Sequence, residues 1–271
     1  MKDISTIEQL LVYEGKKANK KDIVFVSEEV FQKDNFFKKL GLTEEDRQEN
    51  EAYLKNIEKY PHALVLVSLM DRGVKAEHVG ILPILIKKEI GSMRFKDLYN
   101  KLTNEHCKNI VEEKIRHRYS SQQTKYLRKA IERIHDNFNS DISNLWNNKP
   151  SSSRVVAELL QFDGCGIKIA TMITNLLHRH FNVEFSDYTG IDVSPDLQVI
   201  KVLKRTGLLP LNLSGDLTKQ LAIYKAKEIN PDYPGIIDLV CWDIGRKYCS
   251  EQKEKSKCEA CPLGRLCKKQ F

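Results

Sequence analysis

Apolar residues recur at helical spacing along most of the chain. Over residues 124–138 they share one helical face, and they are Tyr126, Leu127, Ala130, Ile131, Ile134 and Phe138. Spacings of three and four residues place side chains on one side of an α-helix. Helix-forming residues that are mostly polar predict a helix over 44–59, and an apolar composition predicts a buried helix over 63–70. Further helices are predicted over 79–90, 95–102, 155–160, 167–181, 196–206, 217–227 and 236–247. The sequence therefore predicts an all-α fold.

Two short segments differ from this pattern. Residues 22–27 have the β-branched and aromatic composition typical of a strand, and we predict a strand there. Residues 63–70 are the most apolar run, but this run is far too short to cross a bilayer. The first residues of the chain lack the apolar core of a secretory signal. We therefore expect a soluble, cytoplasmic protein without a membrane partner.

The composition limits the class of protein. Of the 271 residues, 41% are hydrophobic, which is enough for a sizeable core and excludes a disordered chain. The formal net charge is +7. An excess of this size is compatible with a nucleic-acid partner but does not require one.

Four of the seven cysteines crowd the end of the chain, in the pattern Cys249-x8-Cys258-x2-Cys261-x5-Cys267. A tight cysteine cluster in a reducing compartment indicates a metal site rather than disulfides. Four thiolates at such spacings can hold either a [4Fe–4S] cluster or a tetrahedral zinc ion. Lysines and arginines surround these cysteines, so the segment could also contact phosphates, although a solvated charged tail is the alternative.

A glycine-containing turn, Gly164-Cys165-Gly166, separates two short apolar helices. Glycines permit a tight turn, and the amides that open the second helix lack internal partners. Such amides form an anion site, where a DNA phosphate could bind without side-chain charge. The pattern is also compatible with an ordinary αα-hairpin.

Two side chains near this turn are candidates for catalysis. Lys168 lies in the first turn of the second helix, where the helix dipole and desolvation would favour its neutral, nucleophilic amine. A solvated surface lysine is the alternative. Asp196 follows Pro195 and begins another apolar helix. The residues leave open whether Asp196 is a helix cap, a catalytic carboxylate or both, and Asp192 is a competing carboxylate.

These features occur in an order that resembles a known family. Residues 160–170, Leu-Gln-Phe-Asp-Gly-Cys-Gly-Ile-Lys-Ile-Ala, resemble the Leu-Pro-Gly-Val-Gly-x-Lys-x-Ala hairpin of endonuclease III-like DNA glycosylases. The segment that begins at Asp196 and ends Lys-Arg-Thr-Gly-Leu is similar to the family's Val-Asp-Thr-His-x-x-Arg-Val-x-x-Arg-Thr. Gly245-Arg-Lys-Tyr-Cys then leads into the cysteines as in the family. The resemblance covers about residues 60–271.

The resemblance implies roles for individual residues. Lys168 takes the place of the catalytic lysine and Asp196 that of the catalytic aspartate, since Arg205 follows Asp196 by nine positions as in the family. The implied cofactor is a [4Fe–4S] cluster, with zinc as a minor alternative, and its ligands are Cys249, Cys258, Cys261 and Cys267. The implied DNA contacts are the turn residues Gly164, Cys165 and Gly166 and two insertion loops with Met70, Arg72, Arg118 and Tyr119.

The resemblance also implies an architecture of two helical lobes with a helix–hairpin–helix motif. Residues 1–55 form an N-terminal extension that packs in part with the cluster lobe. Residues 56–183 form a six-helix barrel lobe, with the motif at about 156–180, and residues 184–271 carry the catalytic aspartate and the cluster lobe. We expect a monomer.

Four departures from the family pattern concern the site. Asp163 replaces the hairpin proline, Leu197 and Gln198 replace threonine and histidine, and the first cysteine gap is longer. The link between Lys168 and Asp196 is also longer, with an insertion around Tyr188.

The implied function is base-excision repair. The protein would flip a damaged or mismatched base out of double-stranded DNA and excise it, and a lysine Schiff base would add lyase activity at the abasic site. Such a protein would be nucleoid-associated in a prokaryote. The alternatives are a monofunctional glycosylase that uses water, a non-catalytic module that binds damaged DNA, and a zinc-containing nucleic-acid protein.

Overall fold

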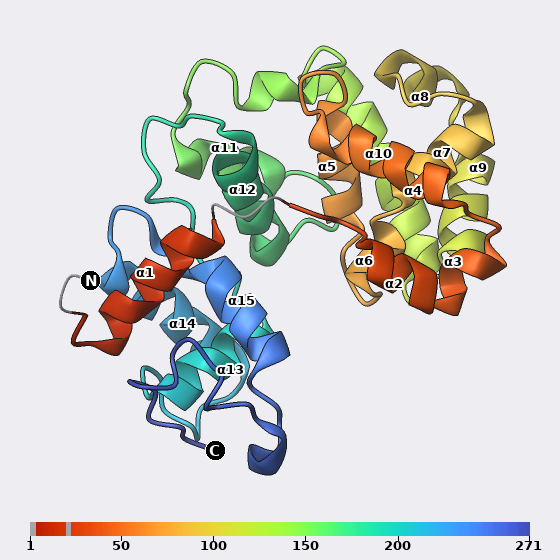
Figure 1. The fold of residues 1–271 in the computed structure, drawn as a ribbon. Helices are drawn as coiled ribbons and strands as arrows, with labels where there is room; N and C mark the ends of the chain where they lie inside the picture. The colour runs from red at the N-terminus through yellow and green to blue at the C-terminus, as the bar shows by residue number, and fades with distance from the viewer. Residues whose placement is uncertain (1–3, 20–22) are drawn as a thin grey trace. The chain divides into compact units, whose positions relative to one another are not determined.

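The computed structural model describes residues 4–19 and 23–271, and over these ranges the chain forms helices and no strands (Figure 1). The all-α prediction is confirmed. Over the same ranges, no helix combines the length and the apolar character that a bilayer crossing requires. The chain divides into two units. Unit 1 contains the described residues of 1–22 with 149–157 and 170–271, and unit 2 contains 23–148 and 158–169. The domain boundaries expected from the sequence remain a prediction.

Unit 2 is built around α5 (Pro61–Leu69), in which every residue is buried. A helix that is apolar on all sides has to lie inside a core. Three helices pack against it, namely α4 (Glu44–Lys55), α7 (Leu82–Ile90) and α10 (Ser120–Asn137). The remaining helices of this unit are α2 (Glu28–Lys33), α3 (Asn35–Lys39), α6 (Ala76–Val79), α8 (Phe95–Lys101), α9 (Asn104–Lys108), a π-helical turn (Asn109–Lys114) and a short 3-10 turn (Ile142–Leu145).

The apolar face predicted for residues 124–138 is confirmed in α10, where Leu127, Ile131 and Ile134 are at most 1% exposed. The helix predicted over 79–90 is confirmed from Leu82 to Ile90 as α7, but its predicted start is wrong, because the chain turns at Gly80 between α6 and α7. The buried side chain of Asn50 replaces the lost helical hydrogen bonds. Its amide donates to the Gly80 carbonyl at 2.7 Å, and its carbonyl accepts from the Ile84 amide at 3.1 Å.

The strand predicted at 22–27 is also wrong where the structure describes it, because residues 23–27 contain no strand. Position 22 lies outside the described residues. A single carboxylate oxygen of Glu51 in α4 accepts from the amides of Phe25 at 3.0 Å and Val26 at 2.7 Å. Backbone amides need partners when they are buried, and here a side chain provides the partner that a neighbouring strand would otherwise provide.

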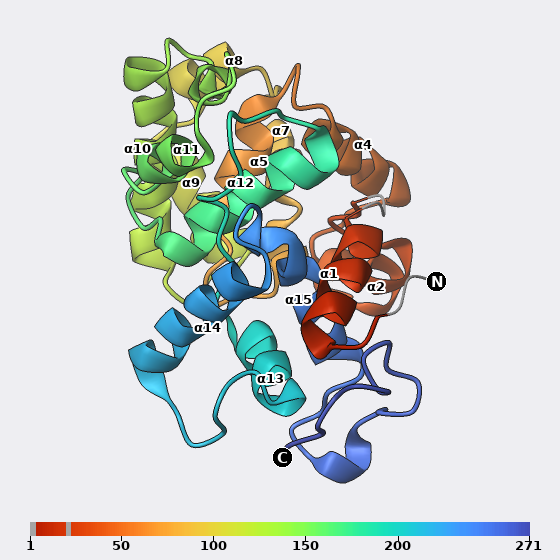
Figure 2. The same ribbon diagram turned by 90° about the vertical axis from the view of Figure 1, so that its left-hand side faces the viewer.

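Unit 1 places α13 (Leu197–Thr206) and α1 (Ile7–Ala18) against α15 (Asp238–Lys247), and α14 (Gly215–Ile229) packs on α13 (Figures 1 and 2). Its core gathers apolar side chains from all four helices, including Leu11, Val202, Ala222 and Ile244. Two further helices, α11 (Ser152–Leu159) and α12 (Ile167–Phe181), contribute residues to both units.

Helix α1 was not predicted from the sequence. It begins with a capping box in which the Thr6 side chain accepts from the Gln9 amide at 3.2 Å and the Gln9 side chain accepts from the Thr6 amide. Gly15 permits close packing on the 3-10 turn before α15 (Pro234–Ile237), because a Cβ there would lie 2.3 Å from the Ile236 carbonyl oxygen. The N-terminal segment is therefore an integral part of the core of unit 1.

Candidate functional site

The glycine turn joins α11 to α12 and is fixed against α10 of unit 2. Gly164 has a φ of 81°, and a Cβ at this position would lie 2.5 Å from the Tyr126 ring. Backbone conformation and packing therefore both require glycine. Asp163, which replaces the proline of the family pattern, forms an ion pair with Lys129 of α10 at 2.5 Å.

The next two residues of the turn differ from Gly164 in their environment. Cys165 is 8% exposed, and burial raises the pKa of its thiol to about 12, so the side chain is a neutral core group. Gly166 is exposed, and a Cβ there would meet nothing within 4 Å. Packing within the protein does not require glycine at this position. A ligand that approaches the backbone closely is a physical reason for its presence.

Lys168 lies in the first turn of α12, and its side chain is 42% exposed. Its Nζ lies 3.6 Å from Oδ2 of Asp71, which lies two residues after the end of α5. The predicted reactive amine therefore faces the turn that was predicted to insert into DNA. Sequence reasoning missed Asp71 as a partner of Lys168, although it belongs to the Asp71-Arg72-Gly73 stretch that ends the apolar helix.

The two predicted insertion loops meet at one aromatic ring within unit 2. The Tyr119 ring lies 5.4 Å from the Arg72 guanidinium and 5.5 Å from that of Arg118, and all three side chains are exposed. Guanidinium groups are attracted to an aromatic face at such distances. We call Arg72, Arg118 and Tyr119 the arginine–tyrosine cluster. Met70 is only 1% exposed, so its side chain belongs to the core, which corrects its assignment as a DNA-contacting residue.

Asp196 belongs to unit 1 and is the N-cap of α13. Its Oδ1 accepts from the amides of Gln198 at 2.8 Å and Val199 at 2.9 Å. The capping role is therefore present. The following residue, Leu197, is 82% exposed. The competing carboxylate, Asp192, pairs with Lys227 at 3.2 Å, and burial raises the pKa of this carboxyl.

The four clustered cysteines line one small cavity of about 20 Å³, together with Arg205, Gly264 and Phe271. Burial, and then the neighbouring thiols, raise the pKa of Cys249 to about 11, and the pKa values of Cys261 and Cys267 are raised in the same way. No three metal-binding side chains in the described ranges are arranged to hold a metal ion.

The donor set of this cavity nevertheless fits a [4Fe–4S] cluster. Four thiols are the ligands that such a cluster takes, and iron would offset the burial and mutual repulsion that oppose thiolate formation. Gly264 supports the fit, because a Cβ there would lie 2.3 Å from the Cys258 carbonyl oxygen. Glycine thus allows the loop to close around these ligands.

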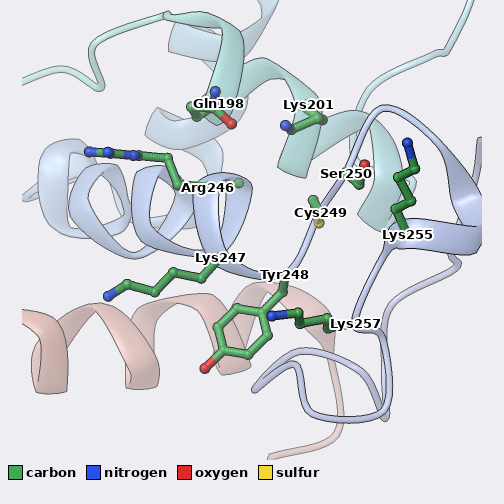
Figure 3. Close-up of a pocket in the computed structure, with 10 residues that line it drawn as sticks. Gln198, Lys201, Arg246, Lys247, Tyr248, Cys249, Ser250, Lys255 and Lys257 are labelled. Carbon is green, nitrogen blue, oxygen red and sulfur yellow. The ribbon is translucent and has the colours of Figure 1, made fainter. Parts of the chain in front are cut away.

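A cationic pocket of about 450 Å³ lies beside the cysteines (Figure 3). Gln198 and Lys201 enter it from α13, and the other cations come from the end of α15 and the following loop, namely Arg246, Lys247, Lys255 and Lys257. Ion pairs hold two of these cations, since Glu251 lies 3.5 Å from Lys201 and Asp243 lies 2.9 Å from Lys247. The pocket has the charge expected of a phosphate-binding surface.

Comparison with known proteins identifies the fold. No protein-family model matches the chain, and no curated protein sequence matches it. The chain is similar to endonuclease III in a trapped covalent DNA intermediate, with a TM-score of 0.55 and 18% identity. It is also similar to endonuclease III in a non-covalent DNA complex, with a TM-score of 0.56 and 19% identity. These matches cover 84% of this chain and 97% and 96% of the endonuclease III chains.

A thermostable thymine-DNA glycosylase is similar with a TM-score of 0.50 and 17% identity, over 75% of this chain and 82% of that chain. At such identities the likeness establishes the fold alone. The chain has the fold of endonuclease III-like, helix–hairpin–helix DNA glycosylases, as the sequence predicted.

Proposed function

We propose that this protein is a base-excision DNA glycosylase with lyase activity through Lys168. The observation that carries the proposal is the position of Lys168, in the first turn of the helix that follows the glycine turn, within a fold like that of endonuclease III. The exposed Gly166 and the cationic pocket support a DNA partner. The substrate is double-stranded DNA with a damaged or mismatched base or an abasic site.

Base removal requires the target nucleotide to leave the stack, at a cost of a few kcal/mol. The arginine–tyrosine cluster is suited to fill the vacated space, because it offers an exposed ring with two guanidinium groups within 5.5 Å of its centroid. In this proposal the hairpin amides of unit 2 and the pocket cations of unit 1 each bind backbone phosphates. Binding energy from these contacts offsets the cost of flipping.

The chemistry takes place at C1′ of the flipped nucleotide. The neutral Lys168 amine attacks C1′, the glycosidic bond breaks, and the base leaves with the bonding electron pair and takes up a proton. The Asp196 carboxylate stabilises the positive charge that develops on the sugar. Ring opening gives a Schiff base on Nζ, and loss of the C2′ proton expels the 3′ phosphate, which cuts the strand.

The cofactor has a separate part in this proposal. Cys249, Cys258, Cys261 and Cys267 would hold a [4Fe–4S] cluster, which when bound cross-links the tail of the chain. The tail then presents Lys255 and Lys257 at the edge of the cationic pocket.

Borohydride trapping tests the proposal on duplex DNA with one abasic site. We expect a covalent adduct with the wild type, and we expect Lys168→Ala to abolish it. Lys125→Ala, at an exposed lysine of α10, is the control and retains the adduct. A Lys168→Ala variant that traps as well as the wild type would contradict the assignment.

The ion pair between Lys168 and Asp71 favours a second candidate, a monofunctional glycosylase. Oδ2 of Asp71 lies 3.6 Å from Nζ, and in this candidate Lys168 acts as an ammonium group that binds phosphate and does not attack C1′. Water would then be the nucleophile. Base release by the wild type without trapping would support this candidate. A non-catalytic module would bind damaged DNA without base release in both the wild type and Asp196→Asn.

A further inference from the structure

A buried histidine connects the two turns of the arginine–tyrosine cluster. His117 is 3% exposed and lies between them in unit 2. Its Nε2 lies 3.1 Å from the carbonyl oxygen of Met70, in the turn after α5. Its Nδ1 lies 3.0 Å from the amide nitrogen of Tyr119, in the turn before α10. One imidazole therefore bridges two turns that lie 47 residues apart in the sequence.

The two hydrogen bonds determine the protonation state of the ring. A carbonyl oxygen only accepts, so Nε2 carries the hydrogen and donates to Met70. A backbone amide only donates, so Nδ1 offers its lone pair to Tyr119. The ring is thus neutral, with one defined tautomer. Protonation would place a hydrogen on Nδ1 and break the bond to the Tyr119 amide.

The surroundings of His117 favour this neutral state. Burial lowers the pKa of the imidazole below its usual value, and the nearby Arg72 guanidinium lowers it further. The hydrogen bond to the Met70 carbonyl and the charge of Asp71 act in the opposite direction. The ring of Tyr119 lies 6.2 Å from the imidazole.

The bridge positions the exposed part of the cluster. The Tyr119 ring packs on Gly73, where a Cβ would lie 2.8 Å from a ring carbon. The same ring lies 5.4 Å from the guanidinium of Arg72 in one turn and 5.5 Å from that of Arg118 in the other. Because His117 holds the backbone of both turns, the three side chains form one surface rather than two independent loops.

We propose that His117 is a positioning residue that locks the two turns into a single DNA-inserting surface and releases Tyr119 when it is protonated in mild acid. The inference rests on the proposed function, since it concerns how the flipped state is held. His117 itself is buried, so in this proposal it acts through the two turns and not by touching DNA.

The test compares His117→Phe with a matched control, His62→Phe. His62 is 2% exposed, lies in the same unit, and its Nε2 lies 2.9 Å from the Met93 carbonyl oxygen, away from the two turns. The probe is a duplex with a tetrahydrofuran abasic-site analogue opposite 2-aminopurine, whose fluorescence reports unstacking. We expect His117→Phe to bind about tenfold more weakly, as the loss of a hydrogen-bonded bridge predicts, and to lose the fluorescence increase.

Trapping on single-stranded abasic DNA separates positioning from chemistry, because no base needs to be displaced there. His117→Phe should trap this substrate as the wild type does, and His62→Phe should behave like the wild type in both assays. A folded His117→Phe protein that unstacks the duplex normally would overturn the inference. A wild type that neither binds nor traps abasic DNA would instead overturn the proposed function.

Hydrogen exchange of the free wild-type protein tests the bridge without any variant. The Tyr119 amide donates to His117, whereas the Gln123 amide donates to the Tyr119 carbonyl at 3.0 Å, an acceptor that does not titrate. We compare the hydrogen-exchange protection factor of the Tyr119 amide with that of the Gln123 amide between pH 7 and about 4.5. As His117 takes up a proton, this ratio should fall by up to about tenfold per pH unit. A constant ratio over this range would overturn the inference even if His117→Phe does not fold.

Discussion

The glycine turn of unit 2 and the cysteine tail of unit 1 are both suited to phosphates, but different forces hold them. The turn is anchored by apolar packing, since Phe162 is 2% exposed and Gly164 packs on Tyr126. The tail has little core of its own. Over residues 249–271, all of which the structure describes, Leu263 is the one buried residue.

The turn and the tail also differ in the groups that they offer to a phosphate. The turn offers backbone amides, which need no charged side chain, whereas the tail and the adjoining helices surround their pocket with five cations. Cations at short range repel one another and favour an open tail. The turn is held by apolar packing that the folded chain itself provides. The proposed cluster would give the tail the cross-link that its small core does not supply, through the four thiols.

Loss of one cysteine ligand is expected to have the largest effect. In Cys261→Ser, bound iron and its visible absorbance should be lost almost completely, and residues 249–267 should lose hydrogen-exchange protection, because too few thiolates remain. Cys165→Ala, at the buried thiol of the turn, should keep its iron. A colourless wild type that contains zinc would contradict the cluster, and an unchanged tail in Cys261→Ser would contradict the dependence on a cross-link.

Acid is expected to lower the stability of unit 2 through a buried histidine. In unit 2, burial lowers the pKa of His62 to about 4, so the unfolded chain binds more protons than the folded chain between about pH 6.5 and 4. The free energy of unfolding should therefore fall by up to ~3 kcal/mol as the pH decreases through this window. Denaturant titrations at several pH values measure the fall. His62→Phe should remove this contribution, and an equal fall in that variant would assign it to other groups.

The two glycines of the turn allow a smaller and more local test. Gly164→Ala should lower the free energy of unfolding by about 2 kcal/mol or more, because alanine is strained at positive φ and its Cβ would overlap Tyr126. Gly166→Ala should leave stability within about 0.5 kcal/mol, since its Cβ meets nothing, yet weaken DNA binding. Thermal unfolding and DNA affinity measure the two effects. Equal losses of stability in both variants would refute the distinction.

The features that could be predicted from the sequence are those set by residues close together in the chain, through periodicity or motif spacing. The apolar face of α10, the start of α12 after the glycine turn and the capping position of Asp196 all follow from local patterns. The four cysteines of one cavity follow from spacing alone.

Contacts between distant segments could not be predicted in this way. The carboxylate of Glu51 replaces a strand partner for residues 25 and 26, and nothing in the local sequence indicates it. The ion pair of Asp71 with Lys168 and the bridge of His117 join residues of different helices or turns. Met70 was assigned to DNA from its place in a loop, but the structure directs its side chain into the core.

Asp71→Asn is expected to have the smallest effect on the free energy of unfolding. It tests whether packing alone, or also charge, holds the glycine turn in place. The ion pair with Lys168 is partly exposed, and pairs of this kind contribute less than ~1 kcal/mol to stability. The free energy of unfolding should therefore change by less than ~1 kcal/mol, and the change should vanish in high salt. Denaturant titrations at low and high salt measure it. A loss of more than ~2 kcal/mol would mean that charge, and not only packing, holds the turn region in place.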